Sequence, residues 1–192
     1  MPMAPPPQLK AGLFARNVGA AKKDDKKKEA PKAAGPKGFP IEHRIGIQAP
    51  AETIWNIIYD LERWSEWNPL YPKASGTIRI GSPLDVTLAV PGQAQRQIHP
   101  VVLEWVPNEQ LHWRLTMIGG LVKNVRYIEI EQLAEESCIV SNGEIFGGLL
   151  GPSVAKQMGR AVFRGFREMN EALKARAEAQ WQASKSGPTS RP

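Results

Sequence analysis

The stretch 45-IGIQAPAETIWNIIYDLERWSEWNP-69 decides the fold, because it passes from a strand into a helix and then stops. Apolar residues alternate along residues 41–47, which is the period of a strand with one buried face. Pro50 suits the first turn of a helix, and the apolar residues after it recur at helical spacing. Asn68-Pro69 and Pro72 disfavour further helix. The predicted strand face is Ile41, His43, Ile45 and Ile47, and the helix face is Ile54, Ile57, Ile58 and Leu61.

Residues 73–147 change to a strand pattern. Short β-rich runs follow one another, separated by turn residues such as Gly81-Ser82-Pro83 and Gly119-Gly120. Connections this short join antiparallel neighbours, because a parallel crossover needs about a dozen residues or more. Together with the first strand, these runs predict about seven strands in one long, curved antiparallel sheet. The runs are 74–80, 83–90, 97–106, 110–118, 124–133 and 138–147.

A long amphipathic helix follows Gly151-Pro152 and runs for roughly thirty residues. Its apolar stripe can pack on the apolar face of the sheet, so the helix and the sheet bury each other's apolar surface. The expected order is a strand, two short helices, six strands and a long helix, which is an α+β fold. The stripe consists of Val154, Met158, Val162, Phe166, Met169 and Leu173.

Charge divides the chain into a basic tail and a neutral domain. Residues 1–38 carry a net charge of +6, which is the net charge of the whole chain, so the remaining residues sum to zero. A neutral domain lacks the basic footprint of a nucleic-acid-binding protein. The tail, rich in Pro, Ala, Gly and Lys, is expected to be disordered and to offer at most a weak membrane-surface or protein contact. We therefore expect a domain at 39–183 and a disordered C-terminus at 184–192.

The prediction of cellular location depends on three features: membrane-spanning segments, a secretory signal and cysteine pairs. No stretch has the ~18 apolar residues that span a bilayer, and the N-terminus has no apolar secretory core. The single cysteine, Cys138, excludes an intrachain disulfide framework. These features predict a soluble, cytoplasmic protein.

Three motifs in register carry a family resemblance. They are Pro-Ala-Glu-Thr-Ile-Trp at 50–55, Trp-Asn-Pro at 67–69 and Gly-Glu-Ile-Phe-Gly-Gly at 143–148. Over residues 40–178 the chain resembles the START-like (SRPBCC, helix-grip) superfamily, and within it the bacterial polyketide cyclase/dehydrase and lipid-transport branch. The resemblance implies a cavity between the concave sheet and the C-terminal helix, with its mouth near Trp67. It implies little about function, because that scaffold serves lipid carriers, hormone receptors and cyclases.

Strand alternation sorts the residues that would line such a cavity. Large apolar residues on alternate positions mark the inner face of each strand, and polar residues of the same parity must face inward with them. Arg126 and Glu144 thus become polar residues on apolar faces of neighbouring strands. Trp67 is a candidate gate at the mouth of the cavity. Trp113 is expected to be a core residue in the first place, and to line the cavity in the second. The predicted ligand-binding set is Trp67, Trp113, Arg126, Ile128, Asn142, Glu144, Phe146, Met158, Val162 and Phe166.

Arg126 and Glu144 admit two interpretations. They can orient the head group of a ligand, or they can form a satisfied structural salt bridge, with Arg126 alternatively reaching out past the rim of the sheet. The functional interpretation predicts that Arg126→Leu or Glu144→Gln weakens ligand uptake more than folding. Glu144, with a pKa raised by burial, is also the one candidate for acid–base catalysis, with Arg126 beside it.

Signals for other chemistry are missing. The histidines His43, His99 and His112 are far apart in sequence, and neither HExxH nor CxxC occurs, so no metal and no cofactor are predicted. No G-x-S-x-G nucleophile elbow is present. The first hypothesis is a carrier or sensor of a lipid, sterol-like or polyketide molecule. The alternatives are an aromatase/cyclase- or dehydratase-type enzyme, and an interaction module that recruits a partner through its basic tail.

Overall fold

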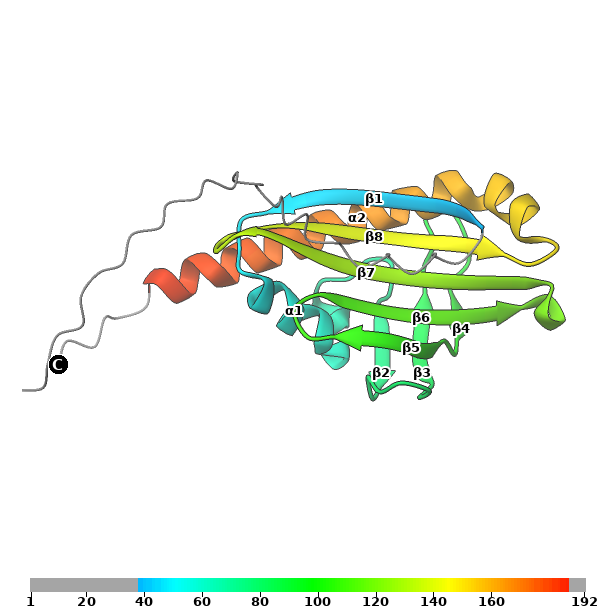
Figure 1. Ribbon diagram of the computed structural model, residues 1–192, viewed down its shortest axis with the longest axis horizontal. Helices are drawn as coiled ribbons and strands as arrows, with labels where there is room; N and C mark the ends of the chain where they lie inside the picture. Colours follow the sequence, from blue (N-terminus) through cyan, green and yellow to red (C-terminus); the bar gives the residue numbers. More distant parts are fainter. Residues whose placement is uncertain (1–37, 187–192) are drawn as a thin grey trace, which may run out of the picture. The chain divides into compact units, whose positions relative to one another are not determined.

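The computed structural model describes residues 38–186, and within them the predicted α+β order is confirmed (Figure 1). A long antiparallel sheet is followed by one long C-terminal helix. The strands are β1 (Phe39–Ile47), β2 (Lys73–Gly76), β3 (Leu84–Leu88), β4 (Arg96–Ile98), β5 (Val101–Val106), β6 (Gln110–Met117), β7 (Val122–Ala134) and β8 (Ser137–Gly147). The helices are α1 (Ala51–Tyr59), the 3-10 turns η1 (Leu61–Glu66) and η2 (Ile118–Gly120), and α2 (Gly151–Ser186).

The strands form two sheets rather than the single sheet expected. A five-stranded sheet has the order β1-β8-β7-β6-β5, and a three-stranded sheet has the order β2-β3-β4. The prediction of about seven strands was one short, because the run 97–106 is divided at Pro100 into β4 and β5. Proline has no N–H to donate to a strand ladder, so it interrupts the run. An isolated bridge between Pro83 and Val101 links the two sheets.

Helix α2 packs along the five-stranded sheet, across β1 and β8 (Figure 1). Its buried side chains recur every three or four residues, so they form one stripe toward the sheet. The C-terminal part of the predicted stripe is confirmed and extends one turn further, while Val154 and Met158 near the start are only half-buried. The buried apolar side chains are Val162, Phe166, Met169, Leu173 and Ala177.

A buried polar joint fixes α2 on the sheet. The Asn142 amide on β8 donates to Oδ1 of Asn170 at 3.0 Å, and the Asn170 amide reaches the His43 carbonyl of β1 at 3.0 Å. Both asparagines are fully buried. Because buried amides need partners, this joint defines which helix residue faces which strand.

The segment after η1 turns the chain into the core. The side chain of Asn68 accepts hydrogen bonds from the backbone N–H groups of Leu70 and Tyr71, at 3.1 and 2.9 Å. This asparagine-centred turn leaves Tyr71 buried and pointing at the inner face of the sheet. The Trp-Asn-Pro motif therefore shapes one wall of the interior.

The expected domain limits differ slightly from the described elements. Helix α2 continues to Ser186, three residues past the expected end at 183. Lys185 pairs with Glu136 at 2.8 Å, which ties this last turn to the β7–β8 connection. The basic tail, except Gly38, and residues 187–192 lie outside the described residues. No helix within residues 38–186 is long and apolar enough to cross a membrane.

Candidate ligand-binding cavity

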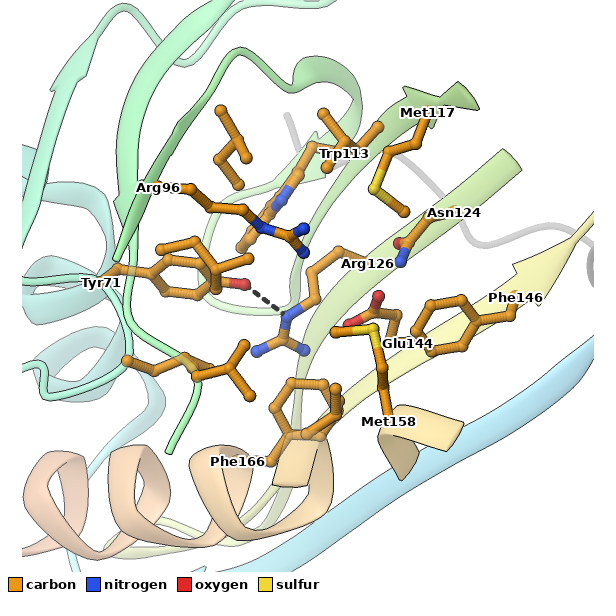
Figure 2. A pocket seen from close by; sticks show the side chains of 16 residues that line it. Tyr71, Arg96, Trp113, Met117, Asn124, Arg126, Glu144, Phe146, Met158 and Phe166 are labelled. Carbon is orange, nitrogen blue, oxygen red and sulfur yellow. Dashed lines mark hydrogen bonds between the residues drawn. The ribbon is translucent and has the colours of Figure 1, made fainter. Parts of the chain in front are cut away.

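A cavity lies between the inner face of the five-stranded sheet, the three-stranded sheet and α2 (Figure 2). Most of its lining is apolar, with a small polar group at one side. The lining side chains are Leu70, Tyr71, Leu88, Val90, Arg96, Ile98, Trp113, Leu115, Met117, Asn124, Arg126, Glu144, Phe146, Met158, Val162 and Phe166. Such a composition, apolar with few polar groups, is typical of a small-molecule site.

The cavity is narrow as it stands. Its internal volume is about 40 Å³, well below the roughly 300–1,000 Å³ of typical small-molecule pockets. A bulky ligand must therefore displace side chains. Met117 and Met158 are half-buried lining residues with flexible side chains that suit this role.

Arg126 is buried in the cavity wall and is held by neutral groups. Its Nε donates to the Tyr71 hydroxyl at 3.0 Å, and its Nη1 donates to the carbonyls of Gly143 at 2.7 Å and Tyr127 at 3.1 Å (Figure 2). The guanidinium carbon lies 3.9 Å from the centroid of the Phe166 ring, a cation–π contact. Arg126 therefore neither leaves the sheet nor forms a salt bridge with a carboxylate of the described residues.

Glu144 is the Cα partner of Arg126 across β7 and β8, and both side chains line the cavity. The Glu144 carboxyl makes no hydrogen bond or ion pair within residues 38–186, although the charges of Arg126 and Arg96 act on it at longer range. Burial raises its pKa from the ordinary 4.5 to about 7, and those two positive charges limit the rise. Near neutral pH the group is thus poised between acid and base.

The outcome for the sequence-predicted residues is mixed. Seven of the ten line the cavity: Trp113, Arg126, Glu144, Phe146, Met158, Val162 and Phe166. Ile128 is core, and Asn142 faces α2, where its amide is occupied by Asn170. Trp67 packs on Trp64 and lines a separate hollow beside Arg176 of α2. These three do not line the cavity. For all ten residues, a direct role in ligand binding stays an untested prediction.

Sequence reasoning missed the wall opposite the large sheet. Tyr71 comes from the turn after η1, and Arg96 comes from the three-residue strand β4. Leu70, Leu88, Val90 and Ile98 complete this wall. The run 83–90 was predicted as a strand, yet nothing local showed that a second sheet folds over the first.

In the described part of the chain, no group of three or more His, Cys, Asp and Glu residues is placed so that it could hold a metal ion. His99 and His112 lie on the surface beside Asp85 and Glu129, and His43 takes part in the Asn170 joint. The residues near the cavity that can exchange protons are Glu144 and Tyr71. Burial raises the pKa of Tyr71, so its hydroxyl stays protonated at neutral pH.

Comparison with known structures returns the same fold. A START superfamily protein from Mycobacterium smegmatis is 23% identical with a TM-score of 0.58, and the match covers 74% of this chain and 99% of that one. The Zhui aromatase/cyclase from Streptomyces sp. R1128 is 15% identical with a TM-score of 0.63, covering 77% and 98%. A norcoclaurine synthase from Thalictrum flavum is 16% identical with a TM-score of 0.58, covering 77% and 99%. At these identities the likeness concerns the fold alone.

Sequence comparison supplies the family. No curated protein matches the chain. The family model described as polyketide cyclase/dehydrase and lipid transport matches residues 39–178, the whole of the sheet and most of α2. With that match over most of its length, the chain belongs to the polyketide cyclase/dehydrase and lipid-transport family.

Proposed function

We propose that the protein binds a hydrophobic small molecule, of the lipid, sterol-like or polyketide kind, in this cavity and acts as its carrier or sensor. The observation that carries the proposal is the cavity itself, walled by two sheets and one helix and lined mainly by apolar side chains. The family description, which includes lipid transport, supports it. A cytoplasmic location belongs to the proposal, and the buried free thiol of Cys138 agrees with a reducing compartment.

The experiment combines native mass spectrometry with a cavity-filling variant. Protein purified from its own host is expected to carry an apolar small molecule that appears as a discrete mass increment. Val162→Phe adds a ring to the cavity wall and should abolish that increment. Val154→Phe makes the same change on the same helix at a half-buried position outside the cavity, and it should retain the ligand.

Folding must be separated from binding in this test. Circular dichroism and the melting temperature show whether Val162→Phe is folded, and Leu115→Phe provides a second filler from β6 if it is not. Retention of the same ligand by both folded cavity fillers would refute the proposed site. A host-purified protein that carries nothing and binds no apolar probe would refute the carrier itself.

A cyclase- or dehydratase-type enzyme is the second candidate, and Glu144 favours it. A carboxyl with a pKa of about 7 in an apolar cavity can take a proton from a bound ligand and return it. A protein named an aromatase/cyclase shares this fold, so the scaffold is compatible with such an activity. Turnover of an added polyketide-type substrate that is lost in Glu144→Gln, with binding retained, would establish the enzyme over the carrier.

The basic tail offers a third proposal. With its net charge of +6, the segment 1–38 suits a weak contact with an acidic partner or an anionic membrane surface. Co-purification of a partner with the full chain, lost when residues 1–37 are removed while the cavity stays empty, would favour the interaction module over the carrier.

A further inference from the structure

The polar part of the cavity carries more positive than negative charge. Among the described lining residues, the charged side chains are two arginines, Arg96 and Arg126, and one glutamate, Glu144. The remaining polar groups, Tyr71 and Asn124, are neutral. When Glu144 holds a proton, two positive charges lie beside an apolar volume without a fixed counter-charge in the cavity wall.

The Nε and Nη1 groups of Arg126 already have hydrogen-bond partners, so this residue acts mainly as a fixed charge. Its hydrogen bonds go to the Tyr71 hydroxyl and to backbone carbonyls, and Phe166 covers one face. These partners hold the guanidinium in place but do not neutralise it. A buried positive charge without a paired anion favours an anion nearby, because the field in an apolar cavity is weakly screened.

Arg96 is the group with free donors. It extends from β4 toward Arg126 and Glu144 (Figure 2), and no hydrogen bond or ion pair holds its side chain anywhere in residues 38–186. A guanidinium presents five N–H donors in a fork that matches the two oxygens of a carboxylate or sulfonate. Arg96 is a solvent-exposed residue at the edge of the cavity, so its side chain can meet an incoming ligand without rearrangement of the core.

Glu144 is the one acidic residue among the described residues that line the cavity. It faces Arg126 on β7, Arg96 on β4 and the Tyr71 hydroxyl, while α2 and β6 present only uncharged side chains to the cavity. An ionised Glu144 would compete with the ligand for Arg96 and repel it. A protonated Glu144 is neutral and can itself donate a hydrogen bond to the ligand.

From this arrangement we infer that the ligand is an anionic amphiphile, an apolar body with one carboxylate-like head group, which Arg96 binds when Glu144 is protonated. The inference rests on the proposed function, since it assigns a chemical class to the ligand of the same cavity. Because burial brings the pKa of Glu144 to about 7, the acceptance of the anion should fall as the pH rises through neutrality.

A matched pair of fluorescent probes tests the inference on the full chain. 1-Anilinonaphthalene-8-sulfonate is anionic at every working pH, and N-phenyl-1-naphthylamine is the same molecule without the sulfonate. Arg96→Gln should weaken the sulfonate about tenfold and leave the neutral probe within about twofold, as expected for one charge-assisted contact. Arg160→Gln is the control, because Arg160 lines a separate open hollow between β1 and α2.

The pH arm uses the same probes between pH 6 and pH 8. The sulfonate should lose about tenfold in affinity over this range in the wild type, since the protonated fraction of a group with a pKa of about 7 falls by that factor. In Glu144→Gln its affinity should be high and independent of pH. The neutral probe should show no pH dependence in either protein.

The outcomes separate the two proposals. If Val162→Phe leaves the affinity of both probes unchanged, or if neither probe binds, the cavity is not the binding site and the proposed function fails. The neutral probe can bind in the cavity while the sulfonate does not bind, or binds with an affinity that Arg96→Gln does not change. In that case the proposed carrier function is retained and the inference of an anionic ligand is wrong. Loss of sulfonate binding in Arg160→Gln alone would place the anion on the outer hollow and also overturn the inference.

Discussion

Glu144 links the chemistry of the cavity to the stability of the fold. Its pKa in the folded protein, about 7, lies above the ordinary 4.5, so the folded state binds this proton more tightly than the unfolded chain does. The resulting stabilisation is fully present below about pH 4.5 and is lost as the pH rises through about 7. By linkage the loss amounts to at most about 3 kcal/mol.

The prediction concerns the pH dependence of unfolding. Between pH 5 and pH 8, the free energy of unfolding of the wild type should fall relative to that of Glu144→Gln, which carries no titrating group there. Denaturant melts at a series of pH values measure this difference. Burial lowers the pKa of His43, which acts in the opposite direction, but His43 is common to both proteins and cancels in the comparison.

Glu135→Gln, in the exposed β7–β8 turn, provides the control and should follow the wild-type profile. Parallel pH profiles for the wild type and Glu144→Gln would show that the carboxyl is ordinarily solvated, and that its buried setting has no energetic consequence.

At the scale of elements, the joint between α2 and the sheet depends on one amide. Asn170 bridges Asn142 on β8 and His43 on β1, so a single helix residue specifies both strand contacts. Neighbouring apolar contacts such as those of Phe166 and Leu173 supply most of the packing energy but little selectivity for register. The position of Phe166 over Arg126 therefore depends on this joint.

Asn170→Ala should lower the free energy of unfolding by about 2–3 kcal/mol, because it leaves buried partners on two strands without a hydrogen bond. Denaturant melts provide the measurement, and Gln157→Ala, exposed on the same helix, should change little. In a double-mutant cycle, Asn142→Ala should cost clearly less in the Asn170→Ala background than alone. Additive costs would mean that the two amides act independently.

At the scale of the molecule, the narrow cavity requires that one wall moves when a ligand enters. The five-stranded sheet and α2 are held together by the buried joint of Asn142, Asn170 and His43. The opposite wall contains β4, which has three residues, lies at the edge of its sheet and pairs only with β3. Regions with few strand-to-strand hydrogen bonds and few buried contacts open at the lowest free energy. We therefore expect β4 to move when a ligand enters.

Hydrogen exchange followed by mass spectrometry checks this expectation. Backbone amides of Arg96–Ile98 should exchange faster than those of β7, which is paired on both sides by β6 and β8. A saturating neutral naphthylamine probe should slow exchange in β4 and leave the centre of β7 unchanged. Probe-induced protection confined to α2, with β4 unaffected, would place the moving wall on the helix instead.

The sequence by itself determined the elements and the facing of their side chains. Strand alternation placed Arg126 and Glu144 inward, because successive side chains of a strand point to opposite faces whatever lies around them. Helical spacing placed Val162 and Phe166 toward the sheet in the same way. These are local rules of backbone geometry, and they held for the polar residues as well as for the apolar ones.

Only the tertiary structure decided which inward residues share the cavity. Asn142 lies on the same face of β8 as Glu144, yet its amide is hydrogen-bonded to Asn170 of α2. Trp67 lines a separate hollow. Tyr71 and Arg96 reach the cavity because a second sheet, separated from the first at Pro100, lies opposite β6 and β7. Long-range packing is set by which surfaces fit together, and no period in the sequence encodes it. The wall of β6–β8 and α2, with Arg126 and Glu144, therefore follows from the sequence, while Tyr71 and Arg96 complete the polar side of the cavity only through the fold.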